Sequence, residues 1–357
     1  MWIGSFHHSD AFQSVGCLVQ TLHWIDLHYL WRTLPTDKPH SKSVIPPTCR
    51  PMPIVAPAAQ LESAVAVAFL EGPAAHADGR VFFSDIWNNC ILCFDPRSKQ
   101  TTVFRADSGR TNGNLFDPQG RLLSCEGNEF GPGGRRRITR SDLTTGQVEV
   151  LTDSFEGQPY NAPNDIAARS NGQIFFTDPC YGDRTTMRLT HESVYRIDVD
   201  GRVTKILSQP AIQRPNGIAL SPDEKTLYVV DSCPVLGGNR KIWAFDLSEQ
   251  GEASGQRQIY DFAPGRGGDG MAVAQDGNLY IAAGIAHARG PHETTDIAPG
   301  IYVVTPHGEL LGMISIPEDV LTNVTFGGDD LRTLYITAGK TLFTIRVNIP
   351  GWVVHRR

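Results

Sequence analysis

The stretch Asn164-Asp-Ile-Ala-Ala-Arg-Ser-Asn171-Gly172-Gln-Ile174-Phe-Phe-Thr-Asp178 contains the unit that decides the fold of this chain. It predicts a short strand, a tight Asn-Gly turn and a second strand, because Asn-Gly favours chain reversal and aromatic and β-branched residues favour strands. The unit occurs six times. Its copies begin at Glu71, Asn112, Asn164, Asn216, Asp269 and Asn323, and a turn residue follows seven positions later at Asp78, Gln119, Asn171, Asp223, Asp276 and Asp330.

These repeats have the length of propeller blades, roughly 40 to 55 residues. Most repeats contain two further predicted strands, at 91–95 and 102–104, 194–198 and 203–207, 242–246 and 258–260, and 301–304 and 311–316. Six repeats of four strands predict an all-β fold, a six-bladed β-propeller. A strand at 342–347 is predicted to pair with an N-terminal strand near 65–70 and close the ring. No segment between the strands has the apolar period of an amphipathic helix, which argues against an α/β fold.

The 357-residue chain is predicted to change character at about residue 60. Residues 1–60 are expected to be a disordered or poorly packed N-terminal extension, since 38–59 are rich in Pro, Ser and Ala. Residues 61–350 are expected to form the propeller. The formal net charge of −6 points to neither nucleic acid nor an anionic membrane as a partner, and the oligomeric state stays open. Seven cysteines predict no disulfide framework, and Cys90 and Cys93 are expected on opposite sides of a strand.

The first residue of every repeat carries a side-chain oxygen that can accept a hydrogen bond or bind a cation. Equivalent positions of propeller blades lie at one height around the axis, so the six oxygens are predicted to face one point in the central channel. A hard cation satisfies such a set. Two carboxylates and four amides favour one calcium ion, with magnesium and manganese as alternatives. Zinc has the least support, because no His or Cys holds an equivalent position. The preference of Asn and Asp for turns explains a single such residue before Gly. It explains neither the Glu at position 71 nor the recurrence of an oxygen-bearing residue at the same position of all six repeats.

Five motifs of the chain resemble the gluconolactonase family, also called the SMP-30 or regucalcin family. They are Glu71-Gly-Pro, Asn161-Ala-Pro-Asn164-Asp165, Phe176-Thr-Asp178-Pro-Cys-Tyr181-Gly182, Arg214-Pro-Asn216-Gly217 and Gly268-Asp269-Gly270-Met271. The resemblance runs from about Val65 to Val347 and implies a six-bladed propeller with metal-dependent lactone hydrolase activity. Animal members carry an arginine shortly before the Asn that matches Asn164. No arginine occurs in 160–163, so the chain looks like the bacterial members.

The resemblance also implies roles for individual residues. Metal ligands of the family match Glu71, Asn216 and Asp269, and an Asn that faces metal or substrate matches Asn164. Asp269 is the candidate general base, and Asn112, Asn164 and Asn323 are candidates to orient substrate hydroxyls. The expected substrate is a small sugar lactone like gluconolactone, which would be opened to the aldonic acid.

Two other functions stay open. One is a non-catalytic propeller that binds a protein or a sugar on its face, and the other is an esterase acting on aryl esters or organophosphates. A serine nucleophile is disfavoured because the chain contains no Gly-x-Ser-x-Gly elbow. Residues 127–134 and 287–296 are predicted to be either solvated loops or a rim that sets substrate choice.

Overall fold

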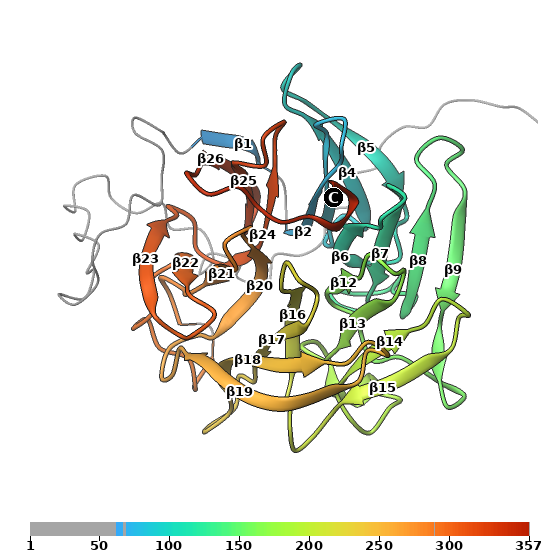
Figure 1. The fold of residues 1–357 in the computed structure, drawn as a ribbon, viewed down its shortest axis with the longest axis vertical. Coiled ribbons are helices and arrows are strands. Elements are labelled where there is room, and N and C mark those ends of the chain that lie inside the picture. The colour runs from blue at the N-terminus through green and yellow to red at the C-terminus, as the bar shows by residue number, and fades with distance from the viewer. Residues whose placement is uncertain (1–61, 67–68, 289, 357) are drawn as a thin grey trace, which may run out of the picture. The chain divides into compact units, whose positions relative to one another are not determined.

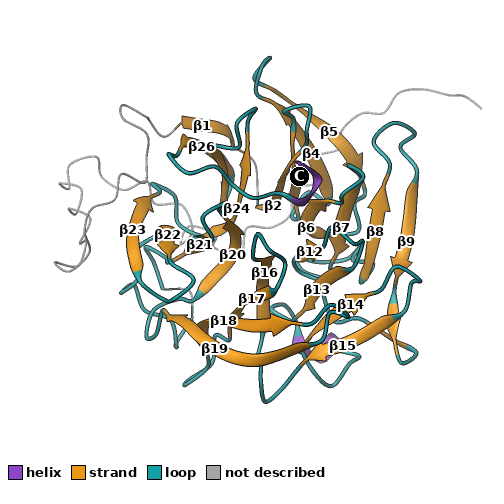
Figure 2. Ribbon diagram, viewed as in Figure 1, coloured by secondary structure: helices purple, strands orange, loops and turns teal. Residues whose placement is uncertain are grey.

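A computed structural model describes residues 62–66, 69–288 and 290–356. The predictions for residues 1–60 therefore lie outside the described residues. The described residues form six four-stranded antiparallel sheets and one two-stranded hairpin, β10 (Ser154–Phe155) with β11 (Gln158–Pro159). They contain no α-helix and only two single turns of 3₁₀ helix, at Arg184–Thr186 and Val354–Arg356. The six sheets surround a common centre as propeller blades (Figures 1 and 2), which confirms the predicted fold class.

The first three blades follow the chain order from the inside outward. Blade 1 comprises β2 (Leu70–Ala75), β3 (Val81–Asp85), β4 (Cys90–Asp95) and β5 (Gln100–Ala106). Blade 2 comprises β6 (Thr111–Phe116), β7 (Leu122–Glu126), β8 (Arg137–Ser141) and β9 (Val148–Thr152). Blade 3 comprises β12 (Ile166–Ala168), β13 (Ile174–Asp178), β14 (Ser193–Ile197) and β15 (Val203–Leu207).

Blades 4 and 5 repeat this order, and blade 6 differs in its outer strand. Blade 4 comprises β16 (Pro215–Leu220), β17 (Thr226–Ser232), β18 (Arg240–Leu247) and β19 (Ala253–Asp261). Blade 5 comprises β20 (Gly268–Val273), β21 (Leu279–Ala283), β22 (Gly300–Val304) and β23 (Leu310–Ser315). Blade 6 comprises β24 (Leu321–Gly327), β25 (Thr333–Ala338), β26 (Thr341–Arg346) and, outermost, the N-terminal β1 (Glu62–Ala66).

Strand β1 closes the ring as the sequence predicts. It pairs antiparallel with β26, with Glu62 opposite Thr344 and Val65 opposite Leu342. The predicted partner near 65–70 is displaced, because Leu70 already belongs to the innermost strand of blade 1. Both ends of the described chain thus contribute to one sheet, and a closed propeller exposes no long free edge to other chains.

The apolar core lies between neighbouring blades. Each of the six clusters of buried side chains joins two consecutive blades, and the last one joins Leu70 and Phe83 of blade 1 to Tyr335 and Leu342 of blade 6. Second strands such as β3 and β21 are buried at every residue, because both of their faces are covered. Their sequences therefore run continuously apolar instead of alternating.

Strand β4 illustrates the same packing and confirms the cysteine prediction. Cys90 contributes to the core between blades 6 and 1, whereas Cys93 contributes to the core between blades 1 and 2. Both thiols are free and buried, and burial raises the pKa of Cys90 to about 11. The two thiols therefore point to opposite faces of one sheet and cannot share a metal ion.

Blade 2 contains strands that the sequence did not predict. Its third strand, β8, begins at Arg137, the last of three consecutive arginines. Strands β8 and β9 lack the dense apolar runs of their counterparts, because β9 is exposed or half-buried along its whole length. No described helix is long and apolar enough to serve as a membrane span.

Candidate functional site

The six residues that begin the repeats lie where the innermost strands start. We call this set the acceptor ring: Glu71, Asn112, Asn164, Asn216, Asp269 and Asn323. In five blades the pairing of the innermost strand with its neighbour is interrupted there, between Glu71 and Ala74, Thr111 and Asn114, Pro215 and Ile218, Gly268 and Met271, and Leu321 and Asn323. Such interruptions bend a strand and redirect a side chain, so one local distortion recurs at the ring position around the propeller.

Close contacts join each ring residue to the next blade. Glycine follows four of the six, and a Cβ atom at any of these glycines would collide with the next blade. The collisions would join Gly72 to Asn112, Gly113 to Asn164, Gly217 to Asp269 and Gly270 to Asn323. Between the last and first blades, Thr322 Oγ1 donates to the Leu70 carbonyl at 2.8 Å. The glycine of the acid-Gly and Asn-Gly pairs is therefore needed for the tight approach of the inner strands.

The acceptor ring is buried to the same depth throughout. Each of its six side chains belongs to a residue that is only 5% to 6% exposed. The structure thus brings together all the residues that the sequence singled out for metal and substrate. Their individual roles stay predictions.

Negative charge accumulates at this end of the channel. Burial raises the pKa of Glu71 well above its ordinary value, and the carboxylates of Asp269, Asp165 and Glu129 raise it further. Glu71 accepts a hydrogen bond from Gly72 N at 3.1 Å, and no Lys, Arg or His in the described part of the chain pairs with it. A carboxylate buried without a cationic partner is costly, so the site is chemically suited to a cation.

The donor set is compatible with a hard metal ion. Among the described residues, no three or more His, Cys, Asp and Glu side chains gather as a metal site by themselves. A metal in the acceptor ring would therefore depend on the Asn amide oxygens as well as on Glu71 and Asp269. Mixed carboxylate and amide oxygens suit calcium better than zinc or copper.

Arg266 is a site residue that sequence reasoning missed. Its Nη2 lies 2.6 Å from Asp269 Oδ2, and its Nη1 donates to the Leu321 carbonyl at 3.4 Å. The guanidinium thus holds one oxygen of the predicted general base and links blade 5 to blade 6. The only signal in the sequence was an arginine three residues before Asp269.

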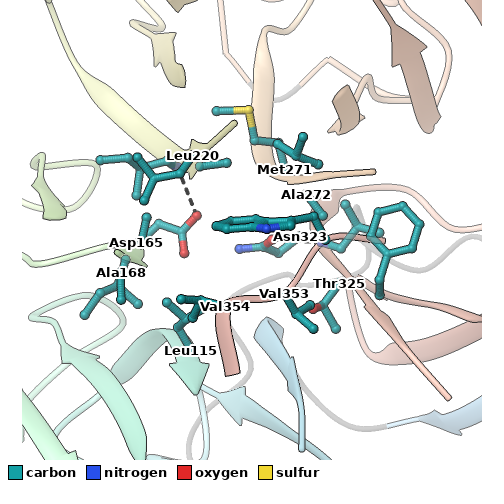
Figure 3. A pocket seen from close by; sticks show the side chains of 18 of the residues that line it. Leu115, Asp165, Ala168, Leu220, Met271, Ala272, Asn323, Thr325, Val353 and Val354 are labelled. Carbon is teal, nitrogen blue, oxygen red and sulfur yellow. Dashed lines mark hydrogen bonds between the residues drawn. The ribbon is translucent and has the colours of Figure 1, made fainter. Parts of the chain in front are cut away.

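Asp165 is a second missed residue, and it lies on the inner side of the ring. It occupies the place that glycine takes in four other blades, and its Oδ2 accepts a hydrogen bond from Ile218 N at 3.2 Å (Figure 3). Burial raises its pKa to about 7, although the backbone N–H groups of Ile166 and Ile218 and the side chain of Asn323 oppose the shift. Asn323 therefore turns at least one polar atom toward Asp165.

A cavity of about 80 Å³ continues the channel beyond Asp165. Its walls are formed mostly by apolar side chains of the inner strands, and the C-terminal residues Trp352, Val353 and Val354 line it as well (Figure 3). Trp352 N donates to the Val273 carbonyl at 2.9 Å, which fixes this segment to the end of β20. Asn323 of the acceptor ring and the neighbouring Asp165 also line this cavity, so it begins directly beside the ring.

Tyr181 supports the ring from blade 3. Its hydroxyl donates to the Ser232 carbonyl at 2.9 Å, and its pKa is raised by burial while the side chain of Asn216 bonds to it. The ring of Tyr181 also packs against Arg214, whose guanidinium carbon is 5.6 Å from the ring centroid. The Arg214 Nε donates to Glu192 at 2.8 Å. These contacts restrict the orientation of Asn216.

Aspartates at the ends of second strands hold the segments that enter the ring. Asp178 accepts hydrogen bonds from Asn161 N at 2.9 Å and Ala162 N at 2.8 Å, just before Asn164. Asp231 does the same for Gln213 N and Arg214 N, at 3.0 and 2.8 Å. The Asp that ends the Phe-Thr-Asp motif therefore positions a ring residue and does not itself belong to the ring.

Replacing Asp178 with asparagine is expected to change how stability depends on pH. Burial raises the pKa of Asp178 to about 7, above the unfolded value of about 4. The folded state thus binds more protons between these values, so this carboxyl stabilises fully below about pH 4, and its contribution is lost as pH rises toward 7. The decline in the free energy of unfolding from pH 4 to 7 should shrink by about 2–4 kcal/mol in Asp178→Asn.

Urea titrations at several pH values would measure this decline. Asp200→Asn, in the exposed turn after β14, is the matched control and should keep the wild-type slope. Equal slopes in Asp178→Asn and the wild type would contradict the assignment.

The polar segment 287–296 lies between β21 and β22. His287 Nδ1 is 3.0 Å from Asp319 Oδ2, and the His292 carbonyl accepts a hydrogen bond from Arg240 Nη2 at 3.3 Å. Both histidines are exposed. Whether the segment contacts a substrate stays a prediction.

Comparison with known proteins identifies the family. A family model described as the SMP-30/Gluconolactonase/LRE-like region matches residues 69–340. The chain belongs to this family. The match includes all six positions of the acceptor ring and confirms the resemblance seen in the sequence.

Relatives within the family are named as lactone-opening enzymes. A gluconolactonase of Zymomonas mobilis is 32% identical over 254 residues, which are 68% of this chain and 64% of that protein. The lactonohydrolase oryL of Aspergillus oryzae is 27% identical over 297 residues, 74% of this chain and 62% of that protein. The chain thus spans somewhat less than two thirds of the length of these two relatives.

A solved structure agrees with the blade arrangement. A gluconolactonase from Xanthomonas campestris superposes with a TM-score of 0.68 at 30% identity, and the match covers 87% of this chain and 99% of that one. The propeller of this chain thus superposes on nearly the whole length of that gluconolactonase.

Proposed function

We propose that this protein is a metal-dependent hydrolase of small sugar lactones, which opens a gluconolactone-like ring to the aldonic acid. The observation that carries the proposal is the acceptor ring, whose two carboxylates and four amides belong to residues that are only 5% to 6% exposed and lie within the part of the chain that matches the gluconolactonase family. Relatives named as gluconolactonase and lactonohydrolase support the substrate class.

Glu71, Asn164, Asn216 and Asp269 would hold one divalent ion, with calcium preferred on the chemistry of the oxygen donors. When bound, the ion would supply Lewis-acid polarisation of the lactone carbonyl. The mutual repulsion of Glu71, Asp269 and Asp165 supports this assignment, because a cation would relieve it.

Asp269 is the proposed general base. Arg266 holds its Oδ2 and would keep the carboxylate ionised and oriented. Asp269 would take a proton from water while the water oxygen adds to the lactone carbonyl carbon. The bond between that carbon and the ring oxygen would then break, and the proton would pass to the departing alkoxide. The product is the aldonic acid, which equals the lactone plus one water.

Asn112 is the preferred candidate for contact with substrate hydroxyls, because it borders a narrow gap that it shares with the carboxyl-bearing Glu129. Asn164 and Asn323 stay in this role as proposals. The Oδ1 of Asn323 accepts a hydrogen bond from Val324 N at 2.8 Å, and its side chain also bonds to Asp165. Its amide is thus partly committed to the protein.

A substrate panel tests the proposal against its alternatives. We expect kcat/KM for D-glucono-δ-lactone to exceed that for phenyl acetate and for a fluorophosphate ester by at least about 10²-fold. Acid release measured in a pH-stat, after subtraction of spontaneous hydrolysis, gives all three rates. A preference for either ester would favour the esterase function, and the absence of all three activities would favour a binding propeller.

A further inference from the structure

The loop 127–134 between β7 and β8 of blade 2 contacts both neighbouring blades, blade 1 through Phe130 and blade 3 through Glu129. At the blade 1 end, the ring of Phe130 packs against Phe69 and Trp87, at centroid distances of 4.8 and 6.0 Å. Phe130 adopts the left-handed backbone conformation, with φ of 59°, which a bulky residue rarely adopts. The surrounding contacts therefore hold the loop in a conformation that it would not choose by itself.

Arg110 fixes the same end of the loop. Its Nε donates to the Pro132 carbonyl at 3.0 Å, and its Nη1 donates to the carbonyls of Ile86 and Trp87 at 2.8 and 2.7 Å. One guanidinium thus joins the loop of blade 2 to the turn that follows β3.

The other end of the loop contacts blade 3 through Glu129. Its Oε1 accepts a hydrogen bond from Tyr181 N at 3.3 Å, which is its only hydrogen bond with the described residues. A carboxylate can accept about four hydrogen bonds. Glu129 is half-buried, and no second hydrogen bond from the described residues fills its remaining acceptor positions.

Glu129 lies beside the acceptor ring and interacts electrostatically with its two carboxylates. It borders a narrow gap together with Asn112 of the ring and Pro163, the residue before Asn164. Its charge acts on Glu71, and the charge of Asp269 acts on Glu129. Burial by the protein, opposed by the bond from Tyr181, raises its pKa to about 7. A carboxyl group is thus held beside the ring on a loop anchored at both ends.

We propose that Glu129 binds hydroxyl groups of the sugar lactone and is a specificity determinant for polyhydroxylated substrates. The inference rests on the proposed lactonase function and names a substrate contact in the same site. A carboxylate makes short, strong hydrogen bonds to hydroxyl groups. A site that hydrogen-bonds substrate hydroxyls discriminates against analogues that lack them.

The test compares two lactones with the same six-membered ring. D-Glucono-δ-lactone carries hydroxyl groups, whereas δ-valerolactone has none. Glu129→Gln should raise KM for gluconolactone by about ten- to a hundredfold, the usual effect of losing a charge-assisted hydrogen bond. It should leave kcat for gluconolactone and kcat/KM for δ-valerolactone within about threefold. Glu156→Gln, in the exposed turn between β10 and β11, is the matched control and should match the wild type on both.

Two binding measurements by calorimetry do not depend on turnover. Gluconate should bind Glu129→Gln about tenfold more weakly than the wild type, whereas calcium should bind both with affinities within about tenfold. A larger loss of calcium affinity would make Glu129 a metal ligand and overturn the proposal.

The kinetic outcomes separate this inference from the proposed function. An equal fall in kcat on both lactones, or unchanged constants on both, would overturn the role of Glu129 while the lactonase function stands. A wild type that hydrolyses neither lactone would overturn the function itself, and unchanged gluconate binding by Glu129→Gln would then overturn the hydroxyl contact as well.

Discussion

Replacing Asp269 with alanine is expected to lower kcat/KM for gluconolactone by at least about 10²- to 10⁴-fold, the range that a general base contributes. The loss should be at the upper end, because the same carboxylate is a proposed metal ligand. Stopped-flow or pH-stat rates would measure it, and circular dichroism would confirm that the propeller is folded.

The alanine variant also leaves Arg266 without the partner that lies 2.6 Å away. The half-buried guanidinium then keeps, among the described residues, only its hydrogen bond to the Leu321 carbonyl, so this variant also changes the local structure around the ring. Asp269→Asn keeps an oxygen acceptor for Arg266 and removes only the basic charge. Asp276→Ala, in the exposed turn of the same blade, is the control and should keep wild-type rates. Activity within tenfold of the wild type in both Asp269 variants would contradict its role as base and ligand.

Removing divalent metal is expected to abolish lactone hydrolysis, and added calcium should restore it. Calcium should also stabilise the fold, because a ligand that binds only the folded state at 100 times its Kd contributes about 2.7 kcal/mol. Thermal unfolding with and without calcium measures this effect independently of catalysis. Full activity in a chelated protein shown by elemental analysis to be metal-free would contradict metal dependence.

Calcium should reverse the order of folding stability between the Glu71→Gln variant and the wild type. Without calcium the variant should be at least as stable as the wild type, because it no longer places a buried charge beside Asp269, Asp165 and Glu129. With calcium it should be less stable, because the lost charged ligand should weaken binding by at least about tenfold. Glu309→Gln, at an exposed turn of blade 5, should show the wild-type order in both conditions. Equal calcium stabilisation in Glu71→Gln and the wild type would remove Glu71 from the ligand set.

Short sequence patterns predicted most strands of the fold. The second strand predicted at 174–178 has the observed bounds of β13, and the repeats at Glu71, Asn112 and Asp269 contain the corresponding second strands β3, β7 and β21. These strands are buried on both faces, so their apolar runs are continuous and their turns supply sharp boundaries. Strands β8 and β9 were missed because β8 contains a single apolar residue, Ile138, and β9 is exposed or half-buried along its whole length.

Repetition in register also located the acceptor ring. A residue type that recurs at one position of a closed repeat must surround the axis, whatever the details of the loops. The glycine after Glu71 or Asp269 carried the same information, since the inner strands approach too closely there for a Cβ atom.

The sequence alone thus determined a six-bladed propeller, the closure by an N-terminal strand and the six residues of the ring, because each follows from a short pattern or from the symmetry of the repeat. Only the tertiary structure decided which other groups meet them. Glu129 contacts Tyr181 across 52 positions of sequence, and Asp165 contacts Ile218 across 53. Such contacts depend on how loops and blades pack in space, and no local periodicity encodes them. The charge balance around the ring, and with it the contacts of the candidate base Asp269 and the presence of Glu129 beside it, is therefore a property of the folded ring.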